Sequence, residues 1–309
     1  MISNQRFEGQ MVHPMKWGKR YPAIGWINIL LELTKFKVSL FAALSTLTGF
    51  VLSHQQLSGE IILPVMGIFF LACGSCALNQ YQERREDSLM ERTKHRPIPS
   101  GKIRSDTALK ISLCFILMGS LFLFCGDNLM VVGLGLFAIL WYNGVYTCLK
   151  RHSAFAAIPG ALIGSIPPIV GGVSGGGHLL DPQILAIAFF FFIWQVPHFW
   201  LLLLSFGKDY EKAGFPSLTR IFTSAQLGRM IFMWILATAG TCMMIPLFGI
   251  GKSPAIHGGL FVAAFWLVWK GSRLLTARKQ DFPFRSAFDA VNSYVALVMV
   301  LLILGAFFN

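Results

Sequence analysis

Charged residues are scarce in this sequence. They make up 13% of its 309 residues, about half of the roughly 25% that is usual in soluble proteins. Acidic residues are rarer than basic ones, with 14 aspartates and glutamates against 26 lysines and arginines. Short stretches of alternating polarity, which would indicate β-strands, are also missing. The composition therefore excludes a soluble globular protein and gives little support to a β-rich fold.

Cysteine and glycine offer little chemistry of their own. The six cysteines mostly lie in apolar segments, so no disulfide framework is expected. Cys73 and Cys76 form a C-x-x-C pair, but the small residues around them favour close helix packing over metal or redox chemistry. The glycine-rich segment 171–177 follows no predicted strand and lacks the Lys-Ser/Thr ending of a phosphate-binding loop.

Long apolar runs are what the sequence has in abundance. Hydrophobic residues make up 55% of the chain, and a bilayer core about 30 Å thick needs about 20 of them per helix. We predict an all-helical membrane domain over residues 28–309, preceded by a cytoplasmic segment over residues 1–27. Its nine predicted transmembrane helices are residues 28–53, 60–81, 107–125, 128–148, 154–174, 183–206, 224–249, 255–275 and 287–308.

The basic residues are distributed unevenly between the two sides of these spans. All but one of the 26 lysines and arginines lie before or at the start of the first span, or beside every second connection after it; Lys252 is the exception. By the positive-inside rule, the N-terminus lies in the cytoplasm and the C-terminus outside. Membrane topology explains the net charge of +12, and no nucleic-acid partner is needed.

Three oxygen-bearing side chains follow one another at the end of the second predicted span. Asn79, Glu83 and Asp87 are spaced by four residues, so on a continuing helix they share one face, about 6 Å apart along the axis. Such a row suits Mg²⁺, which typically takes one or two carboxylates together with substrate phosphate oxygens. Arg92 and Arg96 follow and could bind an anionic substrate. The spacing leaves open the alternative of a charged helix end that faces water.

Polar side chains also lie near the ends of the fourth and sixth predicted spans. Tyr146 and Lys150 are one helical turn apart, on the same predicted side of the membrane as the acidic residues. Trp194, Gln195 and His198 lie in or near the end of the sixth span, where polar groups are costly unless they face a cavity or a partner. For His198, a packing role and a ligand contact both remain open.

Taken in order, these segments resemble the UbiA superfamily of membrane prenyltransferases, and more narrowly its protoheme IX farnesyltransferase (heme O synthase) branch. The resemblance rests on NQYQERRED, MERTKHRPIPSG, YTCLKR, SIPPIVGG, WQVPHFW and DYEKAGFPSL. It implies about nine helices around a central cavity, in an enzyme of the bacterial cytoplasmic membrane. It also implies farnesyl diphosphate and heme B as substrates, Mg²⁺ as cofactor, and contact with membrane lipid.

The resemblance also implies a role for each motif residue. The metal would be held by oxygen ligands, namely Asn79, Glu83, Asp87 and Asp209. The diphosphate would be bound by Asn79, Arg92, Arg96, Lys150 and Asp209. The expected catalytic residues are Glu83, Asp87, Tyr146 and Lys150, with Tyr146 near the reacting carbon. The candidates for binding the acceptor are Trp194, Gln195 and His198.

Several positions depart from the family pattern. Glu83 replaces the usual first aspartate, Arg85 and Glu86 replace an acid and an aliphatic residue, and Phe36 replaces a proline. Ala213 stands where many members have a further aspartate, although the heme branch often has alanine there. Two alternatives therefore remain: an aromatic or quinone-precursor acceptor, and a non-catalytic heme- or lipid-binding factor for oxidase assembly. Association with heme A synthase or oxidase assembly proteins is a further expectation.

Overall fold

A computed structural model describes residues 23–307 except 57, 127, 252 and 277–283. These described residues form helices and no strand. Lengthwise helices make up most of the fold: α2 (Phe36–His54), α3 (Ile62–Gln82), α5 (Ser105–Phe124), α6 (Leu129–Ile139) with η2 (Leu140–Tyr146) and α7 (Thr147–Leu149), α8 (Ala157–Gly160) with α9 (Leu162–Ser174), α10 (Pro182–Ser205), α12 (Ser224–Met244), α13 (Pro254–Thr276) and α14 (Phe284–Phe307).

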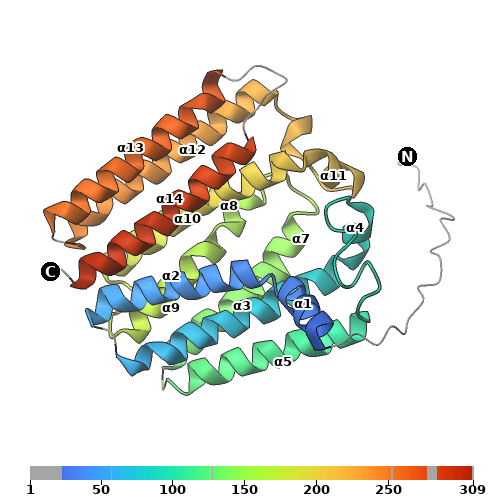
Figure 1. The fold of residues 1–309 in the computed structure, drawn as a ribbon, viewed down its shortest axis with the longest axis horizontal. Helices are drawn as coiled ribbons and strands as arrows, with labels where there is room; N and C mark the ends of the chain where they lie inside the picture. The colour runs from blue at the N-terminus through green and yellow to red at the C-terminus, as the bar shows by residue number, and fades with distance from the viewer. Residues whose placement is uncertain (1–22, 57, 127, 252, 277–283, 308–309) are drawn as a thin grey trace.

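The number of spans agrees with the prediction of about nine. Eight segments in the described part of the chain are long and apolar enough to cross a membrane. The ninth long helix, α13, has 23 residues and runs beside α12 and α14 along the length of the bundle (Figure 1). It carries Lys270 and Arg273 in its last two turns. The all-helical membrane fold is therefore confirmed, whereas most of the predicted segment 1–27 lies outside the described residues.

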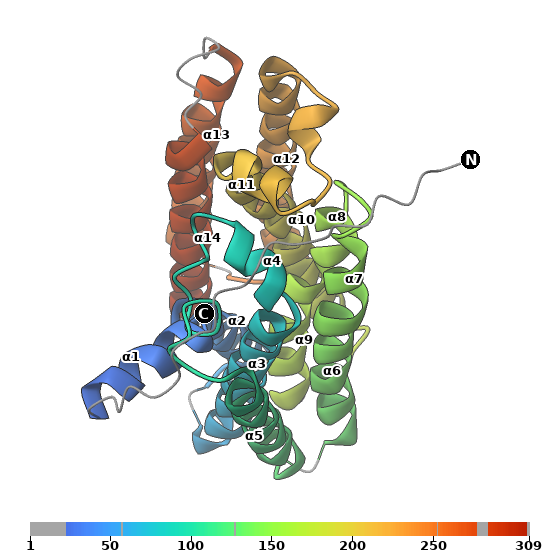
Figure 2. The same ribbon diagram turned by 90° about the vertical axis from the view of Figure 1, so that its right-hand side faces the viewer.

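The first predicted span, residues 28–53, is wrong at its start. The chain forms a separate helix, α1 (Ala23–Leu33), which projects obliquely from the bundle before α2 begins (Figure 2). The break falls at Lys35, whose φ of 47° and ψ of 54° are left-handed, a conformation that non-glycine residues rarely adopt. Gln80 stabilises the break, because its Nε2 donates to the carbonyls of Glu32 (2.9 Å) and Leu33 (3.0 Å) at the end of α1.

Two larger apolar cores hold most of the long helices together, and a third, smaller one packs α1 against α3 and α5. One of the larger cores joins α10, α12, α13 and α14, and the other joins α3, α5, α6 and α9. Between α2 and α9, glycines allow backbone-to-backbone contact: a Cβ at Gly49 would lie 2.0 Å from the Pro168 carbonyl oxygen, and one at Gly171 would lie 1.9 Å from that of Thr46. Small residues bring membrane helices together in this way.

Short helices gather at one end of the bundle. Helix α4 (Arg84–Leu89) follows α3, and α11 (Gly207–Lys212) follows α10. Figures 1 and 2 both place α4 and α11 near each other at this end, which we call the site end. The remaining short elements are the turns η1 (Gly59–Ile61), η3 (Leu218–Arg220) and η4 (Ile245–Phe248). The site end therefore brings together two long connections, residues 83–104 between α3 and α5 and residues 206–223 between α10 and α12.

Candidate active site

Asn79, Glu83 and Asp87, which we call the acidic row, are buried. Their side chains belong to residues that are only 2%, 5% and 0% exposed, respectively. Helix α3 ends at Gln82, yet the backbone N–H groups of Glu83 and Asp87 still bond the carbonyls four residues earlier, at 3.0 Å and 2.8 Å. The predicted spacing therefore survives the break between α3 and α4. The alternative of a helix end that faces water is wrong.

Each carboxylate of the acidic row faces a cation from another segment. Lys150, after α7, forms an ion pair with Glu83. Arg96 places its Nη1 2.8 Å from both carboxylate oxygens of Asp87. Burying a lone carboxylate is costly, so these cations stabilise the acids where they lie. The structure thus brings together four predicted site residues, and the two cations form ion pairs with the two acids.

Lys35 is a site residue that the sequence reasoning missed. Its left-handed backbone directs Nζ to within 3.2 Å of Oδ1 of Asn79. Burial, assisted by the positive charge of Arg96, lowers the pKa of Lys35 to about 8. In the sequence, the one feature that could have pointed to Lys35 as a site residue was its position next to Phe36, near the start of the first predicted span.

A π-helical segment positions Tyr146 and Lys150. η2 has the wider π-helical turn, a form that is often found at functional sites. Asn143 anchors it to α3: its Oδ1 accepts from Ser75 Oγ at 2.6 Å, and its Nδ2 donates to the Ser75 carbonyl at 3.0 Å. Lys150 Nζ lies 5.3 Å from the centre of the Tyr146 ring, which places the ring beside the Lys150–Glu83 pair.

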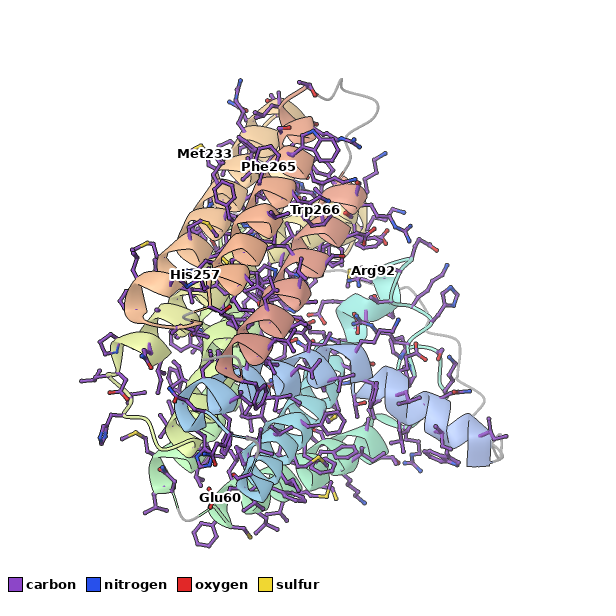
Figure 3. All side chains as sticks on the ribbon, turned by 60° about the vertical axis from the view of Figure 1, so that its left-hand side comes forward. Glu60, Arg92, Met233, His257, Phe265 and Trp266 are labelled. Atoms are coloured by element: carbon purple, nitrogen blue, oxygen red, sulfur yellow. The ribbon has the colours of Figure 1, made fainter. Side chains whose placement is uncertain are left out.

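Arg92 and Asp209 join the two long connections. The Asp209 carboxylate accepts from the Arg92 backbone N–H at 3.2 Å, and the Arg92 guanidinium donates to the Tyr210 hydroxyl at 3.4 Å and lies 4.7 Å from the Phe206 ring centre. Figure 3 shows Arg92 on the connection that follows α4. Within the described part of the chain, the buried Nε of Arg92 has no hydrogen-bond partner. An unpaired buried donor calls for an explanation, and an anionic ligand would provide one.

Aromatic rings lead from the acidic row to α10. Successive ring centres lie 5.0–5.7 Å apart along the series Tyr142, Tyr146, Phe199, His198, Trp194 and Phe41. The series begins beside Asn79, whose Oδ1 accepts from the Tyr142 hydroxyl at 3.4 Å. It makes this part of the bundle rich in π systems, which suit apolar chains, flat rings and cations.

His198 is fixed in one orientation by α14. Its Nδ1 lies 2.7 Å from Oδ1 of Asn292, while Nδ2 of Asn292 donates to the Phe288 carbonyl at 2.8 Å. Because the Asn292 oxygen faces the ring, the Nδ1 of His198 carries the proton and the lone pair is left on Nε2. Trp194 is held similarly, since its Nε1 donates to the Val291 carbonyl at 3.1 Å.

Gln195 points elsewhere. A Cβ added at Gly164 of α9 would lie 2.7 Å from Oε1 of Gln195, so this side chain packs against α9. Residues 194 and 198 share a helix face, whereas residue 195 is turned about 100° from residue 194. Of the three predicted acceptor residues, Trp194 and His198 share the aromatic series and Gln195 lies beside it.

The donor set suits a metal ion that arrives with its own anionic ligands. In the described segments, no three His, Cys, Asp or Glu side chains gather closely enough to hold a metal by themselves. Mg²⁺ commonly needs only one or two protein carboxylates when substrate phosphates and waters complete its shell. Two buried carboxylates beside partly buried cations, with the unpaired Arg92 nitrogen nearby in sequence, fit that mode of binding.

The described part of the chain is thus a polytopic helical protein with two buried carboxylates and their partly buried cation partners gathered at one end of the bundle. Residues 42–293 match the UbiA prenyltransferase family, and the chain belongs to that family.

Relatives named protoheme IX farnesyltransferase match over most of the chain. The protein of that name from Nitratidesulfovibrio vulgaris (strain DP4) is 31% identical over 274 residues, covering 88% of this chain and 93% of the relative. The one from Geobacter sulfurreducens is 35% identical over 224 residues, covering 71% and 81%.

Solved structures share the fold. A digeranylgeranylglyceryl phosphate synthase superposes with a TM-score of 0.72 at 15% identity, covering 92% of this chain and 99% of its own. A UbiA homolog from Archaeoglobus fulgidus bound to GPP and Mg²⁺ superposes with a TM-score of 0.67, also at 15% identity, covering 91% and 100%. At this identity the similarity establishes the fold alone.

Proposed function

We propose that this chain transfers a farnesyl group from farnesyl diphosphate to a vinyl group of heme B, forming heme O. The observation that carries the proposal is the acidic row, buried against cations beside an aromatic series that can receive apolar substrates. The relatives named protoheme IX farnesyltransferase support the choice of donor and acceptor.

The acidic row and its cations form the diphosphate half of the proposed site. Mg²⁺ would be held by Asn79, Glu83, Asp87 and Asp209, and when bound it would stabilise negative charge on the departing diphosphate. Lys150, Arg96 and Arg92 would bind the diphosphate oxygens through charge-assisted hydrogen bonds. The cations that now face Glu83 and Asp87 would thereby exchange a carboxylate partner for a phosphate partner.

The apolar half of the proposed site handles the carbon chemistry. When the bond between C1 of the farnesyl chain and oxygen breaks, the electron pair leaves with the diphosphate and an allylic cation remains. The ring face of Tyr146, stacked on Phe199 at 5.5 Å, stabilises such a cation. The terminal vinyl carbon of heme B attacks C1, water adds to the carbon cation beside the porphyrin, and loss of a proton leaves a hydroxyl group.

His198 and its neighbours form the acceptor half of the proposed site. The free lone pair on Nε2 can coordinate the heme iron or accept a hydrogen bond. Trp194 lies 5.0 Å from the His198 ring, centre to centre, and provides an apolar surface for a flat macrocycle.

Replacing His198 with alanine is expected to weaken binding of heme B by about tenfold, because one buried polar contact is lost. Binding of farnesyl diphosphate should stay unchanged, because the acidic row is intact. Titrations followed by the heme absorption spectrum and by calorimetry would measure the two affinities. The matched control is His257→Ala in the first turn of α13, well separated from Arg92 in Figure 3. Equal weakening in both variants would remove His198 from the acceptor half.

Lys35 is expected to make farnesyl diphosphate binding sensitive to pH. Its pKa of about 8 means that the side chain is charged below that pH and becomes neutral above it. Affinity should therefore fall as the pH rises above 8, by up to about tenfold per pH unit. Dissociation constants between pH 7 and pH 9.5 would measure the fall. Lys35→Arg stays charged throughout, so an identical pH profile in this variant would contradict a role for Lys35.

The proposal includes a cellular setting. The site end would face the cytoplasm of a bacterial inner membrane, as the basic residues predict, and the product would pass to heme A synthase or to oxidase assembly proteins. Hemes extracted from cells that contain or lack this protein test the function. We expect heme heavier than heme B by one farnesyl group and one hydroxyl group only when the protein is present. Unchanged heme together with a prenylated aromatic product would favour the quinone-type alternative.

A further inference from the structure

A cavity lies between α13 and α14. It has a volume of about 440 Å³, and its polar lining consists of Lys270, Arg285, Ser286, Asp289 and Ser293, with Trp266 as its aromatic wall. Figure 3 shows Trp266 on α13 beside α14. We call this cavity the α13–α14 cleft.

The cleft opens to the outside of the bundle. Ser286, Asp289 and Ser293 are exposed, whereas Val291 and Tyr294 of the same helix are fully buried. A ligand of the cleft would therefore approach from the surroundings of the protein and not through the proposed active site.

The described lining of the cleft carries a net positive charge. Within the described part of the chain, neither Lys270 nor Arg285 forms an ion pair, although they come from two neighbouring helices. Lys270 Nζ instead lies 5.6 Å from the centre of the Trp269 ring. Asp289 supplies the single carboxylate, which leaves a net charge of about +1 at neutral pH.

The cleft also lies at a defined depth. α13 ends and α14 begins at the site end of the bundle, where α4 and α11 also lie (Figure 1). Trp266 and Trp269 accompany the cations there, and tryptophan is typical of the boundary between acyl chains and headgroups. Basic pockets between membrane helices on the cytoplasmic side bind anionic lipid headgroups.

We propose that the α13–α14 cleft binds the headgroup of an anionic phospholipid. Lys270 and Arg285 hold the phosphate from two sides, and the hydroxyls of Ser286 and Ser293 donate to its oxygens. The acyl chains leave past Trp266 toward the membrane. The lipid ties α13 to α14 at the end where the acceptor half of the bundle closes.

The test measures lipid binding to the purified, detergent-solubilised protein by native mass spectrometry. Phosphatidylglycerol is the anionic probe, phosphatidylcholine is the zwitterionic control, and inorganic diphosphate tests whether a soluble anion competes. The double variant Lys270→Gln/Arg285→Gln should bind phosphatidylglycerol about 30-fold more weakly, given the attraction that each cation contributes near a surface. The matched control Lys110→Gln/Arg229→Gln removes the same charge from α5 and α12 and should leave binding unchanged.

Asp289→Asn provides a result that a damaged fold would not give. Removing the carboxylate removes its repulsion of the phosphate, so phosphatidylglycerol should bind several-fold more tightly. Equal losses in the double variant and its control would overturn the proposal, because they would indicate unspecific attraction. So would an unchanged affinity in the double variant, equal binding of phosphatidylcholine, or displacement of the lipid by inorganic diphosphate at similar concentrations.

Discussion

Replacing Asp87 with asparagine is expected to lower kcat for heme O formation by about 10³-fold, the scale on which removal of one group that stabilises a transition state acts. Asp87 is fully buried and holds Arg96 through both carboxylate oxygens at 2.8 Å. Asparagine keeps the shape but removes the charge that a diphosphate-bound metal requires. Initial rates with purified protein, farnesyl diphosphate and heme B would measure the loss.

Glu86→Gln is the matched control for Asp87. Glu86 lies on the same short helix, but it is partly exposed and pairs with Arg151 at 2.9 Å, outside the acidic row. The rate of the Glu86→Gln variant should stay within about twofold of the wild-type rate, because exposed ion pairs contribute little to stability. Elution as a single folded species would show that Asp87→Asn still folds. Full activity of that variant would exclude Asp87 from the catalytic machinery.

Replacing Lys150 with methionine is the second change with a large expected effect. Lys150 forms the ion pair with Glu83 and lies beside the Tyr146 ring, so its loss removes a diphosphate ligand and leaves a buried carboxylate unpaired. We expect kcat/KM for farnesyl diphosphate to fall at least about 100-fold. The free energy of unfolding should fall by about 3–5 kcal/mol, as when one partner of a buried ion pair is removed.

A double variant isolates the loss of stability that follows from the loss of Lys150. In Lys150→Met/Glu83→Gln both charges are gone, so stability should recover while kcat/KM stays low. Thermal unfolding and steady-state rates measured on the same preparations would show the difference. Recovery of activity together with stability would exclude both Lys150 and Glu83 from the proposed site. Arg151→Gln, the neighbouring residue outside the acidic row, is the control for a change of charge at this end of the bundle.

The acidic row could be predicted from sequence because its spacing repeats every four residues. Asn79, Glu83 and Asp87 needed only helical geometry to share a face, and basic residues beside alternate connections placed Lys150 on the same side of the membrane. The alternative that they face water could be rejected only with the structure, because burial depends on helices far away in the chain. The pairing of Arg96 with Asp87 was hidden for another reason: it depends on the conformation of the short connection between them and not on helical spacing.

The break before α2 could not be predicted. Residues 28–53 are apolar enough to read as one helix, and no glycine or proline marks the left-handed residue Lys35. The partner of His198 was equally hidden, since Asn292 lies 94 residues away on α14. Local sequence patterns show which residues share a helix face. The position of Lys35 and the tautomer of His198 instead follow from packing between helices that are distant in the sequence.

Heme-dependent release of diphosphate by the purified protein tests the central claim most directly. With farnesyl diphosphate and Mg²⁺ present, we expect diphosphate release only when heme B is added, with one heme O formed per diphosphate released. The Asp87→Asn variant should bind heme B normally and release almost nothing. Release that depends on a hydroxybenzoate-like acceptor instead of heme B, or tight binding of farnesyl diphosphate without any turnover, would contradict the account.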